Sequence, residues 1–151
     1  MNTLLLAELK SDEKDLLETL VLLEEHIFQD IVCQPVKHDT DQVNQSLDPL
    51  EKIIEQCLAV IEEIDSPLEK AETLLNELYY QHLFIDNHKS SWPLDSFKVA
   101  TSLNQRLMSP MVKAALICEI INACGFVTDL VFVPTKVMVR LCCDEQHAII
   151  F

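Results

Sequence analysis

Cysteine and histidine are the residue types in this chain that could carry nucleophilic, acid–base or metal chemistry. The 151 residues include six cysteines and five histidines. Cys142, Cys143 and His147 come close together in a segment with the composition of β-strands. Adjacent strand residues point to opposite faces, and no Cys-x-x-Cys pair supports them, so Cys142 and Cys143 are poorly placed to hold one ion. We therefore expect packing roles for these side chains and no metal site.

His82, Asp86 and His88 form a second polar cluster, followed by Trp92. The spacings of four and two could bring the first three together on a turn, but no further acidic ligand follows closely. An ordinary surface loop is the expectation for residues 82–93. A lone tryptophan beside a helix start packs over the edge of the core or serves as a binding hot spot. Trp92 is therefore a candidate partner-binding residue.

The clearest helix start is Ser109-Pro110, because serine caps free N–H groups and proline fits the first turn. The helix should end at Gly125, the only glycine, and two apolar strand-like runs follow. Cysteine hydrolases hold an activated thiol at such a helix N-terminus, where partial positive charge favours the thiolate. This helix begins Ser-Pro-Met-Val, without a thiol. Cys118 lies about two turns further in among apolar residues, so we expect a buried, inert thiol.

The rest of the chain is predicted mainly from the spacing of apolar residues. Residues 36–47 lack periodicity and should form a loop. Strands are expected over 129–133 and 136–143, and Asp144-Glu145 should turn into a third strand over 147–151. Further helices are expected within 1–32, from Asp48-Pro49, from Ser66-Pro67, and over 95–107 with Phe97, Ala100, Leu103 and Leu107 facing inward. This is a single α+β domain over 1–151, with four to five helices and an antiparallel sheet of two to three strands at the C-terminal end.

The net charge of −14 is unevenly distributed. Residues 1–90 hold twenty acidic residues and six lysines, whereas residues 91–151 hold five acidic and five basic residues. The acidic part should repel nucleic acid and anionic membranes, because phosphate binding needs clustered Lys and Arg. Its helices carry solvated acidic faces or dock a basic partner.

Several classes of function are excluded by what the sequence lacks. One glycine leaves no glycine-rich phosphate loop, so no nucleotide cofactor is expected. No signal peptide and no apolar run long enough to span a membrane is visible. Six cysteines without extracellular signs are typical of reduced thiols, so a cytoplasmic protein is expected.

The order of elements and the stretch Phe-Val-Pro-Thr-Lys-Val-Met-Val-Arg at 132–140 resemble the bacterial SirB-type proteins. These carry a transglutaminase-like domain followed by tetratricopeptide repeats. The resemblance covers residues 74–151 most clearly, with 1–90 as an acidic helical part and 91–151 as the core helix plus strands. It includes the segment Leu-Asn-Gln-Arg-Leu ending at 107 and the helix end Ala-Cys-Gly at 123–125.

The resemblance implies a catalytic frame whose reactive residues are missing. In catalytic relatives a Cys lies in the first turn of the core helix, a position that falls within Pro-Met-Val at 110–112. A His on the following strand accepts the thiol proton, and Lys136 stands in its place. The Asp or Asn that orients the His would lie just beyond Phe151. No catalytic residue is therefore expected.

We predict a non-catalytic transglutaminase-like protein that acts through protein–protein interaction. A terminal strand with an open edge invites pairing with another chain, so Ile149, Ile150 and Phe151 are candidate partner-binding residues. A homodimer through this strand and an unidentified protein partner are both open. The alternatives are a cysteine-dependent hydrolase or acyltransferase with a relocated nucleophile, and a shortened gene product without independent activity.

Overall fold

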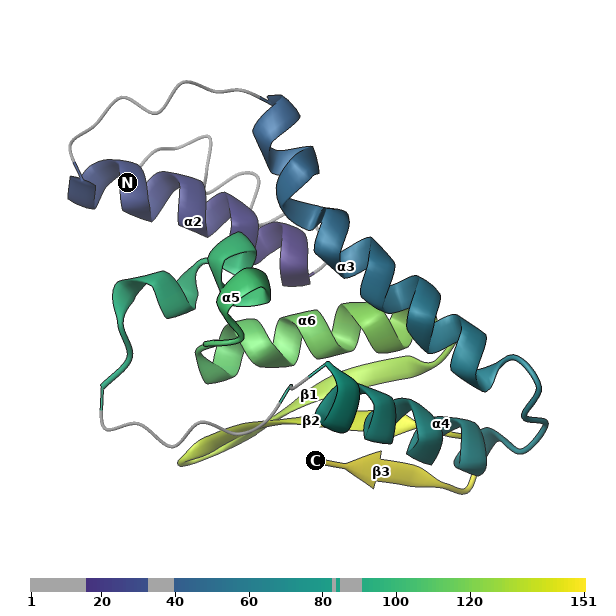
Figure 1. Ribbon diagram of the computed structural model, residues 1–151. Helices are drawn as coiled ribbons and strands as arrows, with labels where there is room; N and C mark the ends of the chain where they lie inside the picture. Colours follow the sequence, from purple (N-terminus) through teal and green to yellow (C-terminus); the bar gives the residue numbers. More distant parts are fainter. Residues whose placement is uncertain (1–15, 33–39, 83, 85–90) are drawn as a thin grey trace. The chain divides into compact units, whose positions relative to one another are not determined.

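The computed structural model describes residues 16–32, 40–82, 84 and 91–151 (Figure 1). The chain divides into two compact units, Met1–His38 and Asp39–Phe151. This boundary lies far from the subdivision near residue 90 that was expected within one domain. In the first unit the structure describes one helix, α2 (Leu16–Val32), where the apolar spacing predicts helix.

The second unit is α+β, as predicted. Two antiparallel hairpin connections join three strands at the C-terminal end, in the order β1-β2-β3. With α2, the chain has five α-helices in the residues described. The elements of this unit are α3 (Thr40–Ile61), α4 (Pro67–Asn76), the π-helical turn η1 (Glu77–Gln81), the 3-10 turn η2 (Leu94–Phe97), α5 (Val99–Gln105), α6 (Pro110–Ala123), β1 (Val127–Val133), β2 (Lys136–Cys142) and β3 (Ala148–Ile150).

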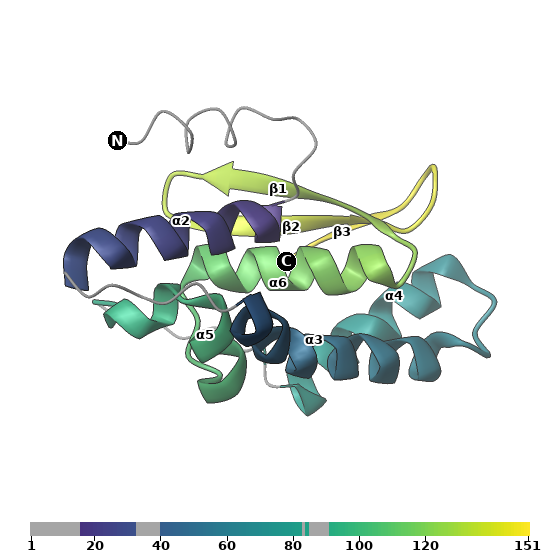
Figure 2. The ribbon, with the colours of Figure 1, turned by 90° about the horizontal axis from the view of Figure 1, so that it is seen from above.

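Helix α6 is the centre of this unit. It packs on one face of the sheet, against β1 and β2, and α3 packs against α6 as well (Figures 1 and 2). Eight of its 14 residues are buried, so it has no broad solvated face. Leu116 and Ile120 are completely buried, and Val139 and Leu141 of β2 are buried too. Burial of such side chains from water is the main source of stability for this core.

The predicted starts of α4 and α6 are confirmed. Ser66 and Ser109 occupy the N-caps, and each helix has proline in its first turn. The Ser109 hydroxyl accepts a hydrogen bond from the Val112 N–H at 3.4 Å. At the other end of α6, Gly125 takes a left-handed conformation with φ of +89°, which favours glycine.

The predicted loop over 36–47 is wrong for residues 40–47, because α3 begins at Thr40. Pro49, which was expected to begin this helix, lies inside it. A polar segment without an apolar stripe can still continue a helix, since the backbone hydrogen bonds do not depend on side-chain polarity. A proline in that helix removes one of these bonds without ending the helix here.

The predicted helix over 95–107 is interrupted. Lys98 has extended backbone angles (φ −92°, ψ 125°) and separates η2 from α5. The interruption changes the direction of the side chains before it, so Phe97 is 46% exposed rather than inward-facing. Leu103, after the break, is buried as predicted.

The expectation of a surface loop over 82–93 is partly wrong. His82 and Phe84 are buried, whereas Trp92 is half-buried and Pro93 is exposed. Residues 83 and 85–90 lie outside the described part of the chain. None of the described helices combines the length and the apolar character needed to cross a membrane.

Candidate functional site

A pocket of about 400 Å³ opens where α6 begins. We call it the α6 pocket. It is formed by the first turns of α6, the beginning of β2, the residue after β3, and two residues from the segments before α5. Its lining consists of Tyr79, Trp92, Met108, Pro110, Lys113, Ala114, Ile117, Thr135, Lys136, Val137, Met138, Val139 and Phe151.

The helix and the sheet position these side chains by regular geometry. Pro110, Lys113, Ala114 and Ile117 follow the spacing of one helix face, so α6 presents a single stripe to the pocket. Phe151 is fixed by the sheet: its N–H donates to the Val139 carbonyl at 3.1 Å, and its carbonyl accepts from the Val139 N–H at 2.9 Å. The α6 stripe and Phe151 are therefore positioned by helix and sheet backbone.

Aromatic contacts connect the helical part to the end of the sheet. The rings of Tyr79 and Phe151 meet edge to face, with centroids 6.2 Å apart and planes at 81°. The Lys113 ammonium lies over the Tyr79 ring, 5.0 Å from its centroid, in a cation–π arrangement. These contacts hold a lysine at the wall of an otherwise largely apolar pocket.

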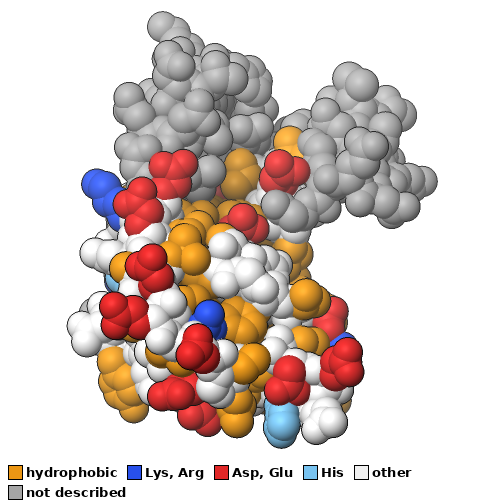
Figure 3. All heavy atoms as spheres, turned by 90° about the vertical axis from the view of Figure 1, so that its right-hand side faces the viewer, with side chains coloured by type: hydrophobic (Ala, Val, Ile, Leu, Met, Phe, Trp, Pro, Cys, Tyr) orange, Lys and Arg blue, Asp and Glu red, His pale blue; other side chains and the backbone are white. Residues whose placement is uncertain are grey.

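The charge of the α6 pocket is opposite to that of the chain. Lys113 and Lys136 line it, and none of the lining residues in the described part of the chain is acidic. The N-terminal turn of α6 adds partial positive charge. The face in Figure 3 carries many acidic and few basic side chains, with apolar surface between them. The pocket is thus a positive region on a negatively charged protein.

The lining residues that the structure describes include no cysteine, histidine, aspartate or glutamate, so no thiol–imidazole pair is present among them. Of the positions where the family resemblance places a nucleophile, Pro110 lines the pocket, Met111 does not, and Val112 is 1% exposed. Lys136, at the position where the resemblance expects a histidine, also lines the pocket.

The candidate partner-binding residues divide between the pocket and the sheet. Trp92 and Phe151 line the α6 pocket together. Ile149 pairs with Leu141 in the sheet and is half-buried. Ile150 is 54% exposed in the same edge strand.

Sequence reasoning missed Tyr79, Lys113 and Met138 as site residues. Lys113 could have been found, because it lies three residues after Pro110 and so on the same helix face. Tyr79 and Met138 carry no such signal, since their place in the site depends on how η1 and β2 pack.

Cys142 ends strand β2, and His147 lies in the turn between β2 and β3. The Asp144 carboxylate accepts hydrogen bonds from the backbone N–H groups of Gln146 and His147, at 2.7 and 2.8 Å. It also contacts Nδ1 of His147 at 2.9 Å. These bonds lower the pKa of Asp144. The described residues contain no group of three metal-ligating side chains.

His82 is buried, and its ring lies beside Glu77. Its Nε2 lies 3.7 Å from a carboxylate oxygen of Glu77, and burial lowers its pKa. Asp86 and His88, which the sequence groups with it, lie outside the described residues. Burial also raises the pKa of Cys118, as expected for an unreactive thiol.

No family model, no curated protein and no solved structure matches this chain. The function of the protein is therefore inferred from the geometry of the α6 pocket and of the sheet edge.

Proposed function

We propose that the protein is a non-catalytic member of the SirB-type transglutaminase-like group and acts by protein–protein interaction at the α6 pocket. One observation carries this proposal. Pro110 is among the positions where the resemblance expects the thiol, Lys136 stands where it expects an imidazole on a following strand, and both line the α6 pocket. A proline and a lysine cannot form the nucleophile–base pair that acyl transfer requires.

The occupant of this pocket is an extended segment of a partner protein that carries a carboxylate beside apolar residues. Lys113 and Lys136 provide the positive charge, and the rings of Tyr79, Trp92 and Phe151 provide apolar surface. A carboxylate gains from both lysines, whereas a basic segment would be repelled. The proposed location of the protein is the cytoplasm, where cysteine thiols stay reduced.

A displayed library of short peptides tests this function. Peptides selected on the full chain should contain Asp or Glu flanked by apolar residues, and Lys113→Glu should weaken their binding at least tenfold. Lys52→Glu is the matched control, because Lys52 is exposed on α3 and does not line the pocket. Equal binding of the selected peptides to both variants would contradict the proposal.

Catalysis is tested separately with ester and amide substrates of cysteine hydrolases and acyltransferases. We expect no turnover above the buffer rate. A relocated nucleophile would instead give steady turnover that alkylation abolishes. His82 and His147 contact Glu77 and Asp144 respectively, which does not favour a thiol–imidazole pair at either histidine.

A second candidate is self-association through β3. This strand pairs with β2 on one side and has no strand on its other side among the described residues. Ile150 exposes apolar surface beside that open edge. Two copies could pair their β3 edges antiparallel and satisfy the outward backbone groups of both.

Light scattering over a wide concentration range tests the homodimer. We expect a mass of twice 17.3 kDa at high concentration, and Ile150→Lys should shift the protein to monomer. Val127→Lys is the matched control, because Val127 is 65% exposed on the opposite edge strand. A monomer at every concentration, or equal effects of both substitutions, would reject pairing through β3.

A further inference from the structure

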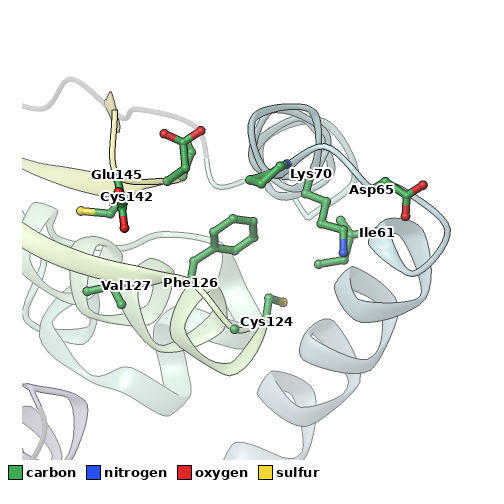
Figure 4. Close-up of a pocket in the computed structure, with 12 residues that line it drawn as sticks. Ile61, Asp65, Lys70, Cys124, Phe126, Val127, Cys142 and Glu145 are labelled. Carbon is green, nitrogen blue, oxygen red and sulfur yellow. The ribbon is translucent and has the colours of Figure 1, made fainter. Parts of the chain in front are cut away.

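A second pocket, of about 540 Å³, lies at the other end of α6 (Figure 4). We call it the thiol pocket, because Cys124, Cys142 and Cys143 are among its lining residues. The ends of α3 and α6, the start of α4 and the turn between β2 and β3 surround it. Figure 4 shows Cys124 and Phe126 lining it together with Ile61 of α3.

Cys124 is held at the edge of this pocket by the helix end. It forms the C-cap of α6, and its N–H donates to the Ile120 carbonyl at 3.0 Å. Gly125, with φ of +89°, then turns the chain away from the helix axis. Cys124 is only half-buried and lines the pocket.

Cys57 contacts Cys124 from α3. It lies one turn before Ile61, is completely buried, and forms a side-chain hydrogen bond with Cys124. The contact belongs to the packing of α3 against α6. Two thiols that are distant in sequence are thus adjacent, with one open to the thiol pocket and one enclosed behind it.

The hydrogen bond makes the two thiols unequal. A thiol hydrogen donated by Cys57 stabilises negative charge on Cys124 and lowers the pKa of Cys124, whereas the same bond and burial raise the pKa of Cys57. The C-terminal end of a helix carries partial negative charge, which opposes a thiolate at Cys124. Cys57 is therefore the group that favours ionisation of Cys124.

We propose that Cys57 and Cys124 form a peroxide-reactive dithiol, in which Cys124 is the attacking residue and Cys57 is the resolving residue. The Cys124 thiolate attacks one oxygen of hydrogen peroxide, an S–O bond forms, the O–O bond breaks and hydroxide leaves. Cys124 is then a sulfenic acid. The Cys57 sulfur attacks the Cys124 sulfur, the S–O bond breaks, and water leaves with the Cys57 proton. Peroxide is reduced, and the two thiols are oxidised to a disulfide between α3 and α6.

The experiment treats the reduced full-length protein with graded hydrogen peroxide. We expect an intact mass lower by two hydrogens and a non-reduced peptide map dominated by one cross-link, between Cys57 and Cys124. Reductant should restore the starting mass. A map in which other cysteines pair first, or no intramolecular cross-link at peroxide levels that oxidise a free thiol peptide, would overturn the proposal.

Variants assign the two roles. In Cys57→Ser the reaction should stop at the sulfenic acid of Cys124, which a sulfenic-specific label traps, and Cys124→Ser should abolish both label and cross-link. Cys118→Ser is the matched control, because it removes another buried α6 thiol and should leave the cross-link intact. Label on Cys57 in Cys124→Ser would reverse the assigned roles and reject the proposal. If Cys57→Ser does not fold, the map of the unaltered protein still decides whether the pair reacts.

Discussion

At the scale of single residues, the chemistry of the α6 pocket depends on Pro110 and Lys136. Both lie on rigid elements, one in the first turn of α6 and one at the start of β2. The surrounding helix and strand supply position and partial positive charge, but Pro110 has no nucleophilic side chain and residue 136 is not a histidine. The pocket could therefore acquire thiol chemistry through side-chain changes alone.

We predict that Pro110→Cys combined with Lys136→His creates a reactive thiol. The helix N-terminus and a protonated imidazole both favour the thiolate, so the new pKa should lie below about 8.5, the usual value for free cysteine. Each unit of lowering increases the thiolate fraction at pH 7 about tenfold. The alkylation rate at position 110 measures this, with Pro110→Cys alone as the control. Identical rates in the single and double variants would show that residue 136 does not reach the thiol.

Asp144 gives a pH-dependent prediction. Its folded pKa is below its ordinary value of 3.8, because Gln146 and His147 donate hydrogen bonds to the carboxylate. A depressed folded pKa means that its stabilising contribution is complete above 3.8 and is lost as the pH falls through the lower folded value. The unfolding midpoint of Asp144→Ala should therefore be lower than that of the unaltered protein near neutral pH.

Denaturation of both proteins from about pH 5 to about pH 2 measures the effect, and the difference should shrink toward the acidic end. Glu145→Ala is the matched control, because Glu145 is an exposed acidic neighbour in the same turn. A constant difference between the two proteins over this range would contradict the role given to the Asp144 carboxylate.

The site was predictable only where the signal is local in sequence. The absence of a thiol at 110–112 and of an imidazole at 136 is read directly from the residue types, and Trp92 and Phe151 are both predicted as partner-binding residues, although no sequence pattern places them in one pocket. Their meeting depends on the pairing of Phe151 with Val139, which residue types alone do not specify. Tyr79 reaches the site through packing of η1, for which the sequence has no pattern.

At the scale of elements, the start of α6 depends on Ser109. The Ser109 side chain accepts from Val112, and its backbone N–H donates to the Ser96 carbonyl at 2.8 Å. We predict that Ser109→Ala lowers the free energy of unfolding by about 1–2 kcal/mol, since the capping bond is lost in a buried place. Denaturant titration at constant pH measures this loss.

Ser66→Ala at the start of α4 is the matched comparison. Ser66 has the same capping role and is also followed by proline, but it is exposed, so water can replace its hydroxyl. Its loss should be clearly smaller. If the two variants lose equal stability, burial at Ser109 does not add to the capping bond.

The elements themselves were predicted unequally. The starts of α4 and α6 and all three strands follow from caps, prolines and short apolar runs. The first turns of α3 do not, because residues 40–47 have no apolar stripe and Pro49 is typical of a helix start. The break at Lys98 also has no local signal, since it is an ordinary residue whose extended backbone separates two helical turns.

At the scale of the whole molecule, the dithiol proposal predicts a change in stability. A disulfide between residues 57 and 124 closes a long loop and restricts the unfolded chain, an effect typically of about 2–4 kcal/mol. The oxidised protein should therefore unfold at higher urea concentration than the reduced protein, and reductant should reverse the gain. Cys57→Ser should show no such gain, and a lower midpoint on oxidation would mean that the cross-link distorts the packing of α3 on α6.

The extensive burial of α6 determines how its amide hydrogens can exchange with solvent. No face of this helix is broadly wetted, so its central N–H groups become accessible only when the sheet or α3 separates from it. Deuterium should enter α6 last among the elements of residues 39–151, at a rate that reports the global opening of this unit. In α4, by contrast, exposed positions such as Glu69 and Glu72 alternate with buried ones, and opening of one turn at a time is enough for exchange.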